Sequence, residues 1–123
     1  MNIYLAAQFK EQETMRIWRS VLHENNLFYV TSRWLDHTEE LNSADATTKA
    51  LIDLEDIDAS DVVISYTLNR GDMFTGGGRH IEFGYAYARN KKLINIGGYE
   101  SVFHSLPNVI TVKSLQEAIE FLK

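Results

Sequence analysis

Three consecutive glycines, Gly76, Gly77 and Gly78, lead directly into a predicted helix that carries Glu82. Consecutive glycines let backbone N–H groups approach a ligand closely, and the positive end of the helix behind them favours oxyanions and sugar oxygens. Glu82 lies about one turn into that helix, which brings a carboxylate to the edge of the same pocket. A polar cradle with one placed carboxylate predicts chemistry on a small, hydroxyl-rich ligand.

The bulk composition narrows the classes of function. The chain has 123 residues, 45% of them hydrophobic, which is enough to form the core of one domain spanning residues 1–123. It has no cysteine, which excludes disulfides and cysteine–metal sites, and its four histidines show no ligand spacing. We therefore expect no metal and no cofactor. The net charge of −5 disfavours a nucleic-acid polymer as a partner.

The beginning of the chain is a short apolar run without a basic flank. This pattern is typical of a buried strand rather than a signal peptide, and no apolar stretch approaches membrane-spanning length. We expect no membrane partner. The absence of cysteine is compatible with a cytoplasmic location.

Apolar runs and helical patterns alternate along the chain. The expected strands span residues 2–7, 27–31, 61–66, 92–96 and 109–112. Helices are expected over residues 13–25, 44–59 and 79–90 and after Ser114. Ser43 and Ser114 are the expected caps of the second and fourth helices. The expected inward residues are Met15, Trp18, Val21 and Leu22 in the first helix, Ala50, Leu54 and Ile57 in the second, and Leu115, Ala118, Ile119 and Leu122 in the last.

This alternation predicts βαβ units and a parallel sheet that is covered by helices on both faces. Five strands with four helices favour a flavodoxin-like three-layer α/β sandwich with strand order 2-1-3-4-5. Ligands of such sheets bind beyond the carboxyl ends of the strands, near the switch point between strands 1 and 3. The segments 6–10, 32–36 and 67–78 should meet there, so the glycine loop falls where the fold predicts a site.

Several short motifs carry a family resemblance. They are Ile-Tyr-Leu-Ala-Ala at 3–7, Asp-Leu-Glu at 53–55, Ala-Ser-Asp-Val-Val-Ile at 59–64 and Gly-Gly-Arg-His-Ile-Glu-Phe-Gly at 77–84. In these motifs and their order, nearly the whole chain resembles the nucleoside 2-deoxyribosyltransferase family. That family includes relatives that hydrolyse nucleoside 5′-monophosphates at the N-glycosidic bond.

The resemblance implies a covalent mechanism without a cofactor. Glu82 matches the family's nucleophile, which attacks the sugar C1′ and leaves a glycosyl ester. Asp53 matches the position proposed to protonate the departing base, and Tyr4 matches the tyrosine that hydrogen-bonds the nucleophile. An anion beneath C1′ suits the oxocarbenium-like transition state, and a raised pKa suits the acid.

Each of these assignments has a structural alternative. Glu82 could be a solvated helix glutamate, although Ile81 and Phe83 leave little of this helix plainly exposed. Asp53 could be an ordinary surface aspartate, and Tyr4 could be an inward-facing strand tyrosine that needs a hydroxyl partner.

The resemblance also suggests substrate-binding side chains. Phe9, Trp34, Met73 and Phe74 could sandwich a flat base, with Trp34 the preferred candidate. Packing against the core is the alternative for each of them.

Arg33 and Arg79 could bind a 5′-phosphate or balance Glu82, and surface ion pairs are the alternative. Arg79 is preferred because it begins the helix beside the glycines. The segment 75–79 (Thr-Gly-Gly-Gly-Arg) lacks the serine of the phosphate loop in the nucleotide-hydrolase relatives, and Arg79 could compensate for that loss.

The expected partner is a nucleoside or nucleotide, and the resemblance leaves transferase and hydrolase activity open. A nucleotide-binding sensor or interaction module on the same fold is the alternative function. A phospho-receiver domain is excluded because Ser65 and Tyr66 stand where its aspartate would end strand 3.

Family members often complete each site with a neighbouring subunit, which implies a homodimer or higher homo-oligomer. Tyr99, Phe103 and Trp34, if exposed together, would favour association. The alternative is that the segment 97–104 folds back on its own sheet.

Overall fold

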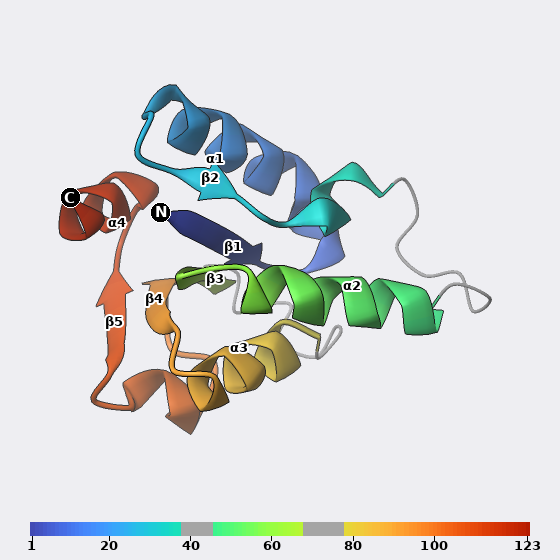
Figure 1. Cartoon of the computed structure of the whole chain (residues 1–123). Helices are drawn as coiled ribbons and strands as arrows, with labels where there is room; N and C mark the ends of the chain where they lie inside the picture. The colour runs from blue at the N-terminus through green and yellow to red at the C-terminus, as the bar shows by residue number, and fades with distance from the viewer. Residues whose placement is uncertain (38–45, 68–77) are drawn as a thin grey trace.

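Five parallel strands form a single sheet at the centre of the protein (Figure 1). The structure is a computed structural model that describes residues 1–37, 46–67 and 78–123. The strands are β1 (Asn2–Ala6), β2 (Tyr29–Val30), β3 (Val62–Thr67), β4 (Lys92–Gly97) and β5 (Val109–Val112). Their order is β2-β1-β3-β4-β5, which confirms the predicted flavodoxin-like arrangement.

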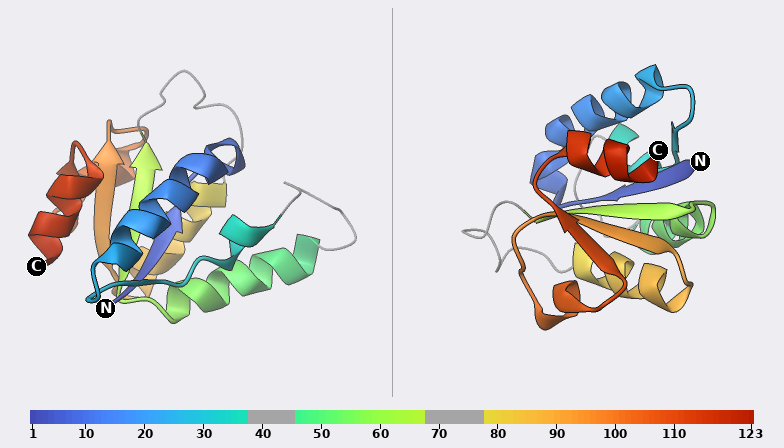
Figure 2. Two further views of the ribbon diagram at one scale, coloured as in Figure 1. Left: turned by 90° about the horizontal axis from the view of Figure 1, so that it is seen from above. Right: turned by 90° about the vertical axis from the view of Figure 1, so that its left-hand side faces the viewer.

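Helices cover both faces of this sheet, as Figure 2 shows. The α-helices are α1 (Gln12–Glu24), α2 (Ala46–Asp58), α3 (Gly78–Ala88) and α4 (Leu115–Leu122). Helices α1 and α4 lie on one face, and α2 and α3 lie side by side on the other (Figures 1 and 2). Short 3₁₀ turns follow three of the strands: η1 (Phe9–Glu11), η2 (Arg33–Asp36) and η4 (Val102–Ser105).

The central strands are buried because both of their faces are covered. In β1, the run from Ile3 to Ala6 is fully buried, and Val62, Val63 and Ile64 of β3 are nearly so. These strands pair in parallel with Ile3 opposite Val62. The apolar centre of the predicted third strand thus forms the middle of the sheet.

Helix α4 follows its prediction closely. The Ser114 side chain accepts a hydrogen bond from the Glu117 backbone N–H at 3.2 Å, which caps the helix. The inward positions predicted for this helix are all buried: Leu115, Ala118, Ile119 and Leu122.

Two of the inward positions predicted for the other helices are wrong. Val21 of α1 is exposed, since the buried stripe runs through Met15 and Leu22 and Val21 lies at its side. Ala50 of α2 is exposed, and only the carboxyl-terminal half of this helix reaches the core, at Ile57. Ser43, the expected cap, lies outside the described residues.

No helix in the part of the chain that the structure describes is long and apolar enough to cross a bilayer.

Candidate active site

A hydrogen bond joins the first strand to the helix that follows the glycines. The Tyr4 hydroxyl, on β1, donates to Oε2 of Glu82, on the second turn of α3. Tyr4 is fully buried, so its hydroxyl needs a partner within the protein, and Glu82 is that partner. The structure therefore brings together two of the residues predicted from the family motifs.

Asp53, on α2, completes a cluster of acidic groups. Burial is the main cause of the raised pKa of Glu82 and of Tyr4, and the negative charge of Asp53 raises both further. Asp53 therefore lies within electrostatic reach of the other two. Among the described residues, the buried oxygen Oδ1 of Asp53 has no hydrogen-bond partner. A buried acceptor without a partner is available to a ligand.

The two carboxyl groups hold protons unusually tightly. Burial raises the pKa of Glu82 to about 8, although the hydrogen bond from Tyr4 lowers it. Burial and the neighbouring Asp56 raise the pKa of Asp53 to about 6, against the opposing charge of Arg33. Near neutral pH the pair therefore holds one proton, which gives the site one acid and one anion.

Contacts between α2 and α3 hold the cluster in place. The Tyr85 hydroxyl donates to Oδ2 of Asp58 at 2.8 Å, and Nε of Arg89 donates to Oδ1 of Asp58 at 3.0 Å. Both donors come from the α3 side, while Asp58 ends α2. These bonds fix the helix that carries Asp53 beside the helix that carries Glu82.

Arg33 is hydrogen-bonded to Asp56, an acid that the sequence analysis did not single out. Asp56 is buried and accepts hydrogen bonds from the backbone N–H of Arg33 at 2.9 Å and from its Nε at 2.8 Å. Asp56 therefore anchors the turn after β2. Of the neighbouring acids on α2, Asp53 alone combines the buried, unpartnered oxygen with the approach to Glu82.

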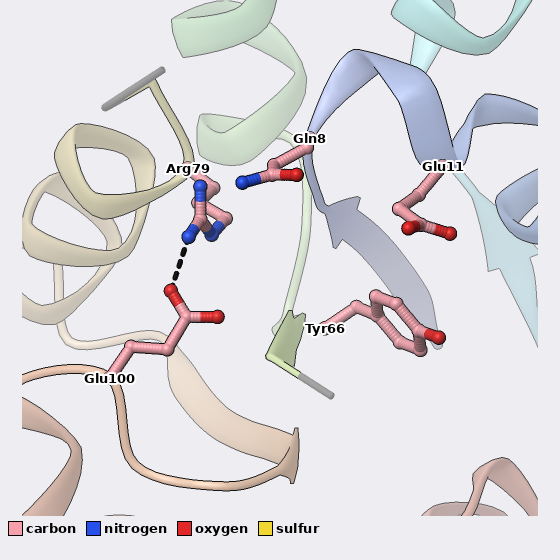
Figure 3. Close-up of a pocket in the computed structure, with 5 residues that line it drawn as sticks. All are labelled: Gln8, Glu11, Tyr66, Arg79 and Glu100. Carbon is pink, nitrogen blue, oxygen red and sulfur yellow. Dashed lines mark hydrogen bonds and ion pairs between the residues drawn. The ribbon is translucent and has the colours of Figure 1, made fainter. Parts of the chain in front are cut away.

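Arg79 is buried at the start of α3, where it forms an ion pair with Glu100. Gly78 begins the helix beside it. Figure 3 shows both side chains lining a small pocket. Sequence reasoning missed Glu100, and the only signal for it was its place in the aromatic segment that follows β4. The predicted residues Gly76, Gly77, Met73 and Phe74 lie outside the described residues.

Trp34 packs against the core, so it is not exposed together with Tyr99 and Phe103. It is only 7% exposed, and its indole N–H donates to the Leu5 carbonyl oxygen at 2.8 Å. The ring of Phe9 lies 6.4 Å from it, centroid to centroid, and is itself partly buried. Stacking of a base on either ring stays a prediction.

Within residues 1–37, 46–67 and 78–123, no three His, Asp or Glu side chains gather in a way that could hold a metal ion. The chemistry available to the described cluster is that of a protonated carboxyl beside a carboxylate, with a tyrosine hydroxyl as donor.

The fold of this chain is similar to that of a solved enzyme. The chain is similar to BcmB, a CMP N-glycosidase of Clostridium botulinum, with 28% identity and a TM-score of 0.60. The match covers 99% of this chain and 98% of that one. No family model and no curated protein matches the chain. The likeness supports the nucleoside N-glycosidase family in general, and the resemblance to the deoxyribosyltransferases stays a prediction.

Proposed function

We propose that this protein cleaves the N-glycosidic bond of a nucleoside or of its 5′-monophosphate. The observation that carries the proposal is the Tyr4–Glu82 hydrogen bond beside the partly protonated Asp53. The full-length similarity to a CMP N-glycosidase supports the same class of reaction.

In the first step of the proposed reaction, a carboxylate oxygen of Glu82 forms a bond to C1′ of the sugar. The C1′–N bond breaks, its electron pair goes to the base, and a proton from Asp53 goes to the base nitrogen. The product is a glycosyl ester of Glu82. In the second step, the Asp53 carboxylate takes a proton from water as the water oxygen attacks C1′, and the ester bond breaks.

The proton must lie on Asp53 when the bond breaks, whereas Glu82 has the higher pKa in the free protein. Positive charge that develops at C1′ beside Glu82 favours the ionised form of Glu82. The charge that develops as the C1′–N bond breaks thus stabilises the arrangement with the proton on Asp53 and the negative charge on Glu82.

The similarity to a glycosidase favours water as the acceptor in the second step. Exchange needs a second base to occupy the place of the first before water reaches the ester. Adding an acceptor base to the assay separates the two reactions, because exchange produces a new nucleoside.

Chromatographic detection of free base tests the proposal. Nucleosides, deoxynucleosides and their 5′-monophosphates are incubated with the wild type and with Glu82→Gln. We expect base release by the wild type, loss of release in Glu82→Gln, and wild-type release in Glu120→Gln, an exposed control on α4. Tight binding without any release would reject the enzyme and favour the sensor.

We further propose that the protein forms a homo-oligomer through α3 and the turn η4. Ile81 is 70% exposed and Phe103 is 62% exposed, and both line an apolar groove. Exposed apolar side chains of this size favour association. Ile81→Glu should lower the mass measured by light scattering, and an unchanged mass would reject this interface.

A further inference from the structure

The pocket in Figure 3 is lined by Arg79, from the helix that carries the proposed nucleophile. Its lining residues come from the carboxyl ends of three strands and from the start of α3: Gln8, Glu11, Tyr66, Arg79 and Glu100. Arg79 and Glu82 are three residues apart on α3, so they lie on the same side of the helix about one turn apart. A group attached to the sugar held at Glu82 would therefore extend toward this pocket.

The described residues that line the pocket carry more negative than positive charge. Among its described lining residues, Arg79 is the one cation, and it is already paired with Glu100. Glu11 adds a second carboxylate, and its charge contributes to the raised pKa of Tyr66, after the larger effect of burial. The amino end of α3 supplies a partial charge of about +0.5. These contributions sum to about −0.5.

His80 does not reverse this balance. Its Nε2 lies 3.4 Å from Oε2 of Glu100, but burial and the neighbouring Arg79 lower the pKa of the imidazole, so the ring is neutral near pH 7. Among the described residues, Arg79 is therefore the cation paired with Glu100 near pH 7.

A phosphate dianion in this pocket would face two carboxylates. At Arg79 it would compete with Glu100 for the guanidinium, because the almost fully buried Glu100 carboxylate is already paired with it. A buried carboxylate that loses its partner is strongly unfavourable. A neutral hydroxyl meets no such barrier, because it can donate a hydrogen bond to a carboxylate.

We propose that the enzyme acts on the unphosphorylated nucleoside in preference to its 5′-monophosphate, with Glu100 as a specificity-determining residue that occupies Arg79. This inference rests on the proposed function. In it, the Glu11 carboxylate accepts a hydrogen bond from the sugar 5′-hydroxyl. The chain thereby differs in substrate from the CMP N-glycosidase to which it is similar.

The test compares cytidine with CMP by their kcat/KM for release of cytosine. We expect cytidine to be preferred by about tenfold or more, because like charges placed together are strongly unfavourable. Glu11→Gln and Glu100→Gln should each reduce that preference. Glu13→Gln, which changes an exposed acid near Glu11, should leave it unchanged. Preference of the wild type for CMP would overturn the inference.

A binding measurement separates this inference from the proposed function. Calorimetry with Glu82→Gln compares cytidine and CMP without turnover, so it does not depend on catalysis. Tighter binding of cytidine together with no base release by the wild type would reject the proposed function and keep the preference. Tighter binding of CMP would overturn the preference even if base is released. Glu11→Gln provides the same comparison if Glu100→Gln fails to fold.

Discussion

The buried carboxyl of Glu82 should make the stability of the folded protein depend on pH. Its pKa is about 8 in the folded state, against about 4.3 in an unfolded chain. The folded state therefore holds a proton that the unfolded state has lost, throughout the interval between these two values. Stability is highest on the acid side of this interval, falls as pH rises through it, and stops falling above about pH 8.

The magnitude follows from the number of protons released on unfolding. One proton corresponds to about 1.4 kcal/mol per pH unit, so Glu82 should lower the free energy of unfolding by about 2 kcal/mol between pH 6 and pH 8. Asp53 contributes mainly below pH 6, because its pKa is about 6. The interval above pH 6 thus isolates the effect of Glu82.

Glu82→Gln removes this group while retaining a hydrogen-bond acceptor for Tyr4. Urea unfolding of the variant and the wild type at several pH values measures the difference in their free energies of unfolding. Between pH 6 and pH 8, the free energy of unfolding of the variant should rise by about 2 kcal/mol relative to that of the wild type. His80 and His104 titrate in both proteins, so their contributions cancel in this difference.

Parallel pH profiles of variant and wild type would refute this reasoning. They would mean that the Glu82 carboxyl has an ordinary pKa and is solvated in the folded protein. Glu120→Gln, on the exposed side of α4, should follow the wild-type profile. If Glu120→Gln also changed the pH dependence of the free energy of unfolding, the cause would be a general effect of net charge.

Four further predictions concern the same cluster and its helix. The kcat/KM for base release should fall below about pH 6 and above about pH 8, following the pKa values of Asp53 and Glu82 in a pH–rate profile. Asp53→Asn should lower kcat/KM by about 10²–10⁴-fold, and a nitrophenyl riboside, which needs no protonation, should lose far less. Tyr4→Phe should lower kcat/KM by about 10–100-fold. It should also move the alkaline limb to higher pH, because the hydrogen bond from Tyr4 lowers the pKa of Glu82 in the wild type and the variant lacks this bond. Gly84→Ala should raise the free energy of unfolding by about 0.5–1 kcal/mol in urea, since a Cβ there has nothing within 4 Å. Equal losses of activity on the nucleoside and on the nitrophenyl riboside would contradict the prediction for Asp53→Asn. An alkaline limb at the wild-type pH would contradict the prediction for Tyr4→Phe, and a lower free energy of unfolding would contradict the one for Gly84→Ala.

The sheet could be predicted because its strands have continuous apolar patterns. Residues 62–64 are apolar without interruption, and this pattern is typical of a strand buried on both faces. The strand order then follows from the rules for parallel sheets. Val21 and Ala50 were misplaced because apolar residues at the side of a helical stripe contact the core only if a neighbouring element reaches them.

The Tyr4–Glu82 contact could be anticipated from the motifs and the fold together, because the carboxyl edge of β1 faces the start of α3. The ion pairs could not be anticipated from the sequence. Arg79 and Glu100 are 21 residues apart, and Arg33 and Asp56 are 23 apart, so neither pair leaves a local pattern. The sequence left packing and base stacking open for Trp34, because the hydrogen bond from its indole N–H to the Leu5 carbonyl oxygen joins residues 29 positions apart.

The most direct test is the mass of the protein quenched during turnover. Wild-type protein is mixed with substrate, denatured in acid and digested, and the peptides are analysed by mass spectrometry. A glycosyl group attached to the peptide that contains Glu82, and absent from Glu82→Gln, is the predicted result. Base release without any adduct on that peptide, or undiminished release by Glu82→Gln, would contradict the proposal that Glu82 is the nucleophile.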